Sequence, residues 1–212
     1  MANQFSFRDA SLSFNDAQFI ANAMDSTIPH LVAAGNAGQW ELSPFLFCRT
    51  GTGDRERIFI AEVEDDQADS ESTANGNLSR RVDDNGKPFL SVGFVKIVEE
   101  QFVSYLKETE SLKAQVEPAL KKGKFVFLQY LVTDHRVGDR RRGAGAALLQ
   151  KVKDYTLERG WKTIWLDCWD GGNGQLVQYY VDQGFDIMGS FRDEGDDDGS
   201  SWNGKLFRMG LR

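Results

Sequence analysis

A cluster of arginine and glycine residues in the second half of the chain has the composition of an anion-binding loop. It reads Arg140-Arg141-Arg142-Gly143-Ala144-Gly145 and lies between an apolar run and an amphipathic stretch. Unpaired N–H groups at a helix N-terminus and neighbouring guanidinium groups both favour a negatively charged ligand. The segment therefore predicts a site for a cofactor that carries a di- or triphosphate.

Other interpretations of this segment compete with that one. A dinucleotide-binding turn would have a third glycine where Leu148 stands, although Asp167 lies at a tolerable distance for its acidic partner. The G-x-x-x-x-G-K-[ST] pattern of a nucleoside triphosphate loop does not occur. The remaining alternative is a tight turn whose arginines are simply solvated.

A second constellation follows on the next expected helix. Asn173 is followed seven positions later by Tyr180, and then by three residues and the pair Gly184-Phe185. Together with Arg140-x-x-Gly143-x-Gly145, in this order, the pattern resembles the GNAT superfamily of acyl-CoA-dependent N-acyltransferases. The resemblance covers most of the chain and is strongest from Tyr130 to Phe185.

The resemblance implies acetyl transfer from acetyl-CoA to an amine in a ternary complex, without a covalent acyl-enzyme and without a metal. Tyr180 would be the general acid that protonates the departing thiolate, and the alternative is a core tyrosine. Asn173 would hydrogen-bond the pantetheine arm, and it could also cap the following helix. The implied cofactor-binding residues are Leu131, Val132 and Thr133 for the pantetheine amides, and Arg140, Arg141, Arg142, Gly143, Ala144, Gly145 and Ala146 for the pyrophosphate.

The general base is the least defined part of the predicted site. An alkyl amine must lose a proton before it attacks, and the central strand carries Gln129 where some family members have a glutamate. Candidates are Glu62, Asp134, His135 and Asp167, and we expect a water relay rather than any one of them. Cys168 is expected to be a buried thiol rather than a nucleophile. Trp40, Trp169 and Trp202 either line the acceptor pocket or pack as core and rim aromatics.

The function predicted in this way is transfer of acetyl to a primary amine of a small, cationic molecule. A protein or peptide N-acetyltransferase and a catalytically silent acyl-CoA-binding or sensing module are the alternatives. The sequence does not indicate the identity of the acceptor, the length of the acyl group or the oligomeric state, so a homodimer is left open.

Hydropathy patterns predict the elements that would position these residues. A single α/β domain over residues 1–212 is expected, with a central, mixed but mostly antiparallel twisted sheet that is flanked by helices and splayed at the central strand. Expected within it are a flexible acidic loop at 64–87 and an inserted helix at 99–117, beginning at Glu99 and stopped by Pro118. The other expected helices are 15–24, with Asn15 and Gln18 as a capping box, 29–35, 143–159 and 175–183; the expected strands are 57–63, 88–98, 124–132, 163–168, 185–191 and 205–211.

Composition limits the other functions that the chain could have. Of its 212 residues, 25 are Lys or Arg and 32 are Asp or Glu, which gives a net charge of −7 and disfavours a nucleic-acid footprint. Two cysteines and two histidines offer no disulfide framework or metal set. Without a signal peptide or an apolar run of membrane length, we expect a cytoplasmic protein with no membrane partner.

Overall fold

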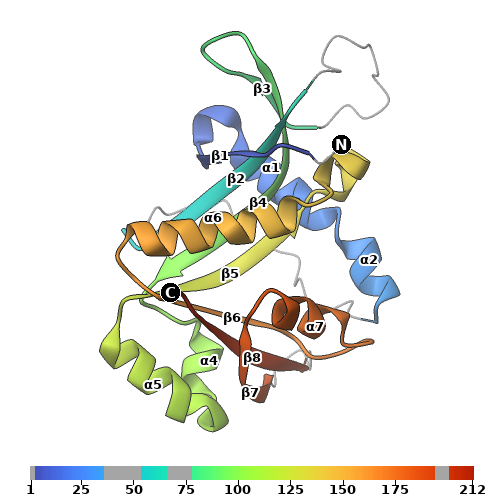
Figure 1. Cartoon of the computed structure of the whole chain (residues 1–212). Coiled ribbons are helices and arrows are strands. Elements are labelled where there is room, and N and C mark those ends of the chain that lie inside the picture. The colour runs from blue at the N-terminus through green and yellow to red at the C-terminus, as the bar shows by residue number, and fades with distance from the viewer. Residues whose placement is uncertain (1–2, 36–53, 66–77, 194–200) are drawn as a thin grey trace. The chain divides into compact units, whose positions relative to one another are not determined.

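The computed structural model describes residues 3–35, 54–65, 78–193 and 201–212 (Figure 1). Its strands are β1 (Ser6–Asp9), β2 (Glu56–Glu64), β3 (Arg80–Val82), β4 (Pro88–Glu99), β5 (Phe125–Thr133), β6 (Thr163–Trp169), β7 (Asp186–Asp193) and β8 (Trp202–Gly210). Its α-helices are α1 (Asp16–Asp25), α2 (Ile28–Ala33), α4 (Ser104–Glu108), α5 (Lys113–Lys122), α6 (Ala144–Glu158) and α7 (Gln175–Asp182). Short 3-10 helices are η1 (Leu12–Phe14), η3 (Glu110–Leu112) and η4 (His135–Arg141).

The strands form one open sheet of eight, in the order β1-β2-β4-β5-β6-β8-β7, with β3 paired to β4. The pairs β1–β2, β3–β4, β6–β8 and β7–β8 are antiparallel, whereas β5 and β6 run parallel. This arrangement confirms the predicted α/β class with a mixed, mostly antiparallel sheet.

The chain divides into two compact units, and each is described by itself. The first comprises Met1–Ile28, Leu42–Lys96 and Tyr130–Lys151, and the second comprises Pro29–Glu41, Ile97–Gln129 and Val152–Arg212. The single domain expected over residues 1–212 stays a prediction.

In the first unit, α1 contributes an apolar face to the core. Phe19, Ile20 and Ala23 are buried there, as are the consecutive residues from Phe59 to Val63 of β2. The helix was expected, but its capping box is wrong. Asn15 has φ 57° and its side chain makes no capping bond, while the Gln18 amide donates to Oδ1 of Asn22 at 2.9 Å.

A buried ion network also belongs to the first unit. Glu62 accepts hydrogen bonds from Arg8 Nε at 2.7 Å and from Arg81 Nη2 at 2.6 Å, and Arg8 also reaches Asp16. Both carboxylates are almost fully buried. Because a buried charge needs a partner, Glu62 is held as a structural anion rather than as a free base.

The second unit is built around an aromatic core. The core residues are Phe102, Leu106, Leu112, Val116, Phe125, Phe127, Trp165, Phe191 and Leu206. Figure 1 shows α4 and α5 lying next to each other at one end of this unit, where they supply part of that cluster. The core therefore joins helices that follow β4 to strands from the C-terminal half of the chain.

The helix predicted over 99–117 is wrong in its bounds and in its continuity. Glu99 is the last residue of β4, and the chain then forms α4, η3 and α5 in place of one helix. The break falls at Thr109, which is extended at φ −70° and ψ 111° and bonds back to the Tyr105 carbonyl. Pro118 lies inside α5 rather than after it.

The other predicted elements are confirmed within a few residues, and four short elements in the described part of the chain were not expected. These are β1, β3 and the 3-10 helices η1 and η4. Strand β3 falls inside the predicted acidic loop 64–87, so this part of that prediction is wrong. Residues 66–77 of this loop, the candidate acceptor-pocket residue Trp40 and residues 194–198 lie outside the described residues.

Candidate cofactor-binding and catalytic residues

The predicted anion loop lies in the first unit, at the start of a long helix. Gly138, at φ 56° and ψ −131°, kinks η4, and Gly143, at φ 89°, leads into α6. The first intrahelical bond of α6 runs from the Ala147 N–H to the Gly143 carbonyl. The first-turn N–H groups of Ala144, Gly145 and Ala146 precede it and have no carbonyl partner within the helix.

A side chain from the N-terminus holds this loop in shape. The Asn3 amide donates to the backbone carbonyls of Arg140 at 2.9 Å, Asp139 at 3.2 Å and Arg142 at 3.3 Å. These contacts occupy carbonyl oxygens, which would repel an anion. No sequence motif indicated this role of Asn3, because it depends on a contact between residues far apart in the chain.

The three arginines of the loop have different surroundings. Arg140 pairs with the buried carboxylate of Asp65 at 3.1 Å and also donates to the Glu64 carbonyl. Arg142 is 81% exposed and pairs with Asp139. Arg141 is partly buried, its Nη1 lies 3.5 Å from Thr133 Oγ1, and its Nε is a buried donor without a hydrogen-bond partner.

The central strand β5 carries the residues predicted to pair with the pantetheine arm. Its parallel ladder with β6 ends at Leu128 and Leu166, and β5 continues to Thr133. On the β4 side, Gly93 approaches closely: a methyl group there would lie 2.7 Å from the Val132 carbonyl oxygen. Leu131 and Thr133 are partly exposed and Val132 is buried.

Tyr180, the predicted general acid, lies in the second unit on α7. The residue is 6% exposed, and its ring packs against Phe185 and Phe207 with centroid distances of 5.9 and 5.8 Å. Burial raises the pKa of the Tyr180 hydroxyl above its ordinary value. Tyr180 therefore stays protonated at neutral pH, which a proton donor requires.

Asn173 and Cys168 also belong to the second unit. Oδ1 of Asn173 accepts from the Gln175 N–H at 3.2 Å, but the N-cap residue of α7 is Gly174, so the predicted helix cap at Asn173 is wrong by one position. Cys168 is buried, and burial raises the pKa of its thiol to about 12. A thiol of this kind is protonated and weakly nucleophilic at neutral pH.

The four candidate bases differ in their hydrogen-bond and ion partners. Glu62 is paired with two arginines, and Asp134 is fully buried and bound by Nη2 of Arg136 at 2.6 Å. The backbone N–H of His135 donates to Ser26 Oγ at 2.9 Å. Asp167 differs from these, because its hydrogen-bonding side chain is Tyr105, whose hydroxyl donates to Oδ2 at 2.9 Å.

The carboxyl of Asp167 has a pKa in the physiological range. Desolvation raises the pKa from 3.8 to about 7, the Tyr105 hydrogen bond opposes that shift, and the charge of Asp193 adds to it. Such a group can accept and release a proton near neutral pH. Asp167 is among the candidate bases predicted from the sequence, whereas Tyr105 and Asp193 are not, because neither stands in a motif.

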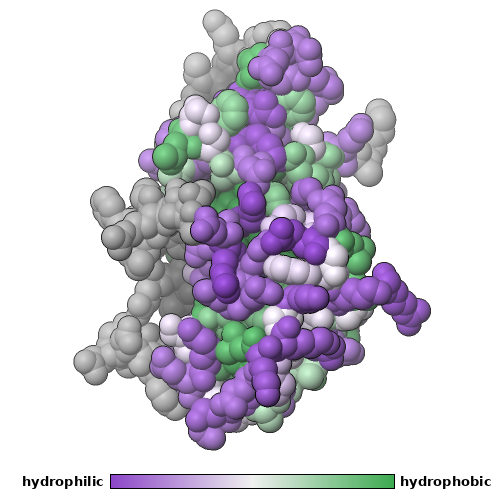
Figure 2. All heavy atoms as spheres, turned by 90° about the vertical axis from the view of Figure 1, so that its left-hand side faces the viewer, coloured by the Kyte–Doolittle hydropathy of each residue, from purple (hydrophilic) through white to green (hydrophobic). Residues whose placement is uncertain are grey.

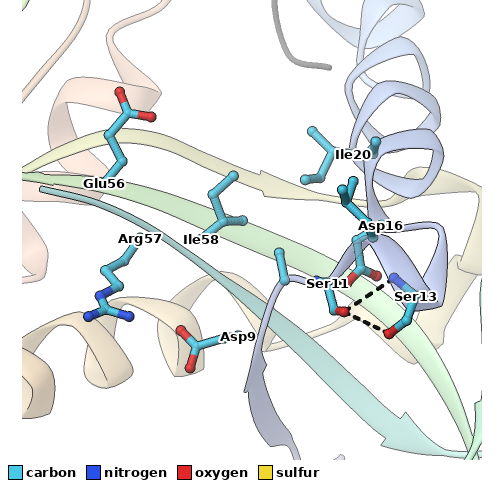
Figure 3. Close-up of a pocket in the computed structure, with 11 residues that line it drawn as sticks. Asp9, Ser11, Ser13, Asp16, Ile20, Glu56, Arg57 and Ile58 are labelled. Carbon is cyan, nitrogen blue, oxygen red and sulfur yellow. Dashed lines mark hydrogen bonds between the residues drawn. The ribbon is translucent and has the colours of Figure 1, made fainter. Parts of the chain in front are cut away.

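A cavity of about 500 Å³ lies elsewhere in the first unit, between β1, η1, α1 and β2 (Figure 3). The Ser11 and Ser13 hydroxyls meet there at 2.7 Å, and Asp16, which also lines it, is engaged by Arg8. None of the residues predicted to bind a cofactor or to catalyse lines this cavity.

Surface and metal-site features add little to the site. Hydrophilic residues predominate on the face in Figure 2, and the apolar residues there form small separate groups. Among the described residues, no group of three or more His, Cys, Asp or Glu side chains could hold a metal ion. Within the same parts of the chain, no helix is both long and apolar enough to span a bilayer.

Solved structures share this fold at low sequence identity. A putative phosphinothricin N-acetyltransferase is 16% identical with a TM-score of 0.58, and covers 99% of both chains. The ribosomal-protein-S18-alanine N-acetyltransferase of Escherichia coli is 13% identical with a TM-score of 0.55, over 98% of this chain and 94% of that one. A spermidine N-acetyltransferase chimera from Vibrio cholerae and hSSAT is 14% identical with a TM-score of 0.54, over 98% and 96%.

The fold is thus that of acetyltransferases. Residues 41–185 match the model of the acetyltransferase (GNAT) family, and the chain belongs to that family. No curated protein matches the sequence significantly. The family uses acetyl-CoA as co-substrate, so the loop at the start of α6 can be compared with what a pyrophosphate needs.

Proposed function

We propose that this acetyltransferase moves the acetyl group of acetyl-CoA to a primary amine of a small, cationic molecule, by direct attack in a ternary complex. The observation that carries the cofactor part is the buried, unpartnered Nε donor of Arg141 in the predicted anion loop. A buried donor without an acceptor is costly, and a phosphate oxygen would satisfy it.

The residues of the loop fit a pyrophosphate, with one change in their expected roles. The first-turn N–H groups of α6 at Ala144, Gly145 and Ala146 supply donors, and Arg141 supplies charge. Arg140 was expected to bind phosphate directly. Since it is already paired with Asp65, we propose that Arg140 positions the loop.

The proposed chemistry of the second unit is proton delivery. Tyr180, kept protonated by burial, would donate to the thiolate as the carbon–sulfur bond breaks. Cys168 stays a neutral thiol, which supports direct attack by the amine over a cysteine-bound acyl intermediate.

The nature of the acceptor is the least supported part of the proposal. The structural neighbours include enzymes named for phosphinothricin, a ribosomal-protein alanine and spermidine, so the fold accommodates both small and protein acceptors. We favour a small cation because the chain has a net charge of −7. We place such an enzyme in the cytoplasm, and leave its oligomeric state open.

The test is release of free CoA thiol from acetyl-CoA in the presence of amines. Turnover with a polyamine, an amino acid or an aminoglycoside supports the proposal. Turnover only with peptides that have a free N-terminus or lysine would favour the protein-modifying alternative. Saturable acetyl-CoA binding without turnover on either set would favour the silent acyl-CoA-binding module.

A further inference from the structure

One end of the second unit gathers carboxylates and aromatic rings on a single face. Tyr105 of α4 stacks near Phe191 of β7 at 6.0 Å and meets the Trp202 ring at 5.8 Å. The Trp202 indole N–H donates to Oδ2 of Asp193 at 3.1 Å, and the Tyr105 hydroxyl donates to Asp167. We call Tyr105, Asp167, Phe191, Asp193 and Trp202 the aromatic–acid cluster.

The aromatic wall of this cluster depends on a glycine. Gly204 of β8 lies under it, and a methyl group there would overlap the rings of Phe191 and Trp202. Tyr105, Asp167, Asp193 and Trp202 each keep partial solvent exposure. The cluster is thus a shaped, partly open surface rather than sealed core.

Among the described residues, no cation balances the charge of Asp167. The groups that shift its pKa include the Tyr105 hydroxyl and the carboxylate of Asp193, and neither is a cation. Lys205, which acts on the adjacent Cys168 thiol, is paired with Asp170. No arginine or lysine is among the groups that shift its pKa. The buried acids Glu62, Asp65 and Asp134, by contrast, all have arginine partners.

A buried polar group without a hydrogen-bond partner stands beside this cluster. The last paired residues of β5 and β6 are Leu128 and Leu166. Gln129 is the next residue on β5, and Asp167 is the next residue on β6. Two positions earlier, Phe127 and Trp165 share one core cluster, so Gln129 and Asp167 lie on the same face. Oε1 of Gln129 is buried and lacks a donor.

From this arrangement we propose that the aromatic–acid cluster binds the ammonium group of the acceptor, and that Asp167, oriented by Tyr105, takes its proton. A cation is favoured beside aromatic faces and an unbalanced carboxylate, and its N–H groups would satisfy Gln129 Oε1. The inference rests on the proposed function and goes beyond it, since it names the base and the cation-binding surface.

The proton and bond changes balance. One proton passes from the ammonium nitrogen to Asp167 and on to water, and the neutral nitrogen forms a bond with the acetyl carbonyl carbon. The carbon–sulfur bond breaks, the thiolate gains a proton from Tyr180, and the nitrogen loses its second proton, which restores Tyr180 through water. The products are the amide, CoA thiol and one proton in solution.

The first test measures amine binding without acetyl-CoA, by calorimetry with butanediamine, methylamine and an amino-acid amide. Asp167→Asn keeps the shape of the side chain and an acceptor for Tyr105, and should weaken binding at least about 10-fold. Asp186→Asn, an exposed acid on the same sheet, is the matched control and should leave it unchanged. No amine binding by the wild type, or equal binding by Asp167→Asn, overturns the proposal.

The second test uses turnover and pH. With a protonated amine at pH 7, Asp167→Asn should lower kcat roughly 100-fold or more, and the acid limb of the pH profile near 7 should disappear. Hydroxylamine, which is neutral at pH 7, should be affected much less. Tyr105→Phe should move the acid limb to higher pH, because the lost hydrogen bond favoured the carboxylate.

These readouts separate failure of the inference from failure of the proposed function. If the wild type binds acetyl-CoA yet acetylates no amine, the proposed function fails and the calorimetry still decides whether Asp167 binds cations. If amines are acetylated and Asp167→Asn has the wild-type kcat and acid limb, the proposed function stands and the role of Asp167 is wrong.

Discussion

Arg140 lies 3.1 Å from Oδ1 of Asp65, a carboxylate with a completely buried side chain, and Arg80 binds the other oxygen of the same carboxylate at 2.6 Å. The arginine that opens the family motif is therefore part of a structural ion network. The neighbouring Arg141, in contrast, has a buried Nε donor without a hydrogen-bond partner.

This difference predicts that substitution of Arg141 lowers CoA affinity, whereas substitution of Arg140 lowers stability. Arg141→Ala should weaken CoA binding by about 1.5–3 kcal/mol, roughly 10- to 150-fold in Kd, because a charge-assisted hydrogen bond is lost. Arg140→Ala should mainly lower the free energy of unfolding, because it leaves Asp65 with one partner fewer. Arg142→Ala should lose less CoA affinity than Arg141→Ala, because the Arg142 side chain is 81% exposed and paired with Asp139. A larger loss of CoA affinity for Arg140→Ala than for Arg141→Ala would contradict this assignment.

The proposed proton donor gives a second prediction. Tyr180→Phe keeps the ring that packs on Phe185 and Phe207 and should reduce turnover about 10²- to 10⁴-fold with little change in acetyl-CoA affinity. The rate of thiol release measures turnover, and a binding titration measures acetyl-CoA affinity. Tyr179→Phe serves as the control, and a Tyr180→Phe enzyme with full turnover would rule out this donor.

The close approach of Gly93 on β4 to Val132 on β5 gives a third prediction, on stability. Gly93→Ala places a methyl group 2.7 Å from the Val132 carbonyl oxygen and should cost about 1–3 kcal/mol of stability through overpacking. Gly210→Ala is the matched control, since a methyl group at this β-sheet glycine would meet nothing within 4 Å. Thermal or urea unfolding of both variants measures the difference, and equal stabilities would contradict the close contact.

The raised pKa of Asp167 makes a fourth prediction, on stability. Between its unfolded value of 3.8 and its folded value of about 7, the folded protein holds the proton more tightly than the unfolded chain. The contribution of Asp167 to the free energy of unfolding therefore falls as pH rises through this window. The free energy of unfolding of Asp167→Asn should therefore rise relative to that of the wild type between pH 4 and pH 7. Urea unfolding of both proteins across this range measures the difference. A difference that stays constant with pH would show that the pKa of Asp167 is ordinary.

Local sequence patterns were sufficient to predict the family and most of the helices and strands. The order Arg140, Gly143, Gly145, Asn173, Tyr180 and Gly184-Phe185 pointed to an acetyltransferase, and the family match agrees. The apolar run around β5 and the amphipathic pattern of α6 indicated their elements within a residue or two. Patterns of this kind are local in the chain, so the sequence by itself contains them.

Tertiary structure alone decided which of several similar side chains are engaged. The sequence does not indicate which of Arg140 and Arg141 is held in an ion pair, or which of Asp134 and Asp167, because ion partners come from residues distant in the chain or from the local fold of a loop. The break at Thr109 has the same origin: the chain must turn there for Leu106 and Leu112 to enter one core. Burial and pairing set the charge and the pKa of each group, and both depend on packing that no single segment encodes.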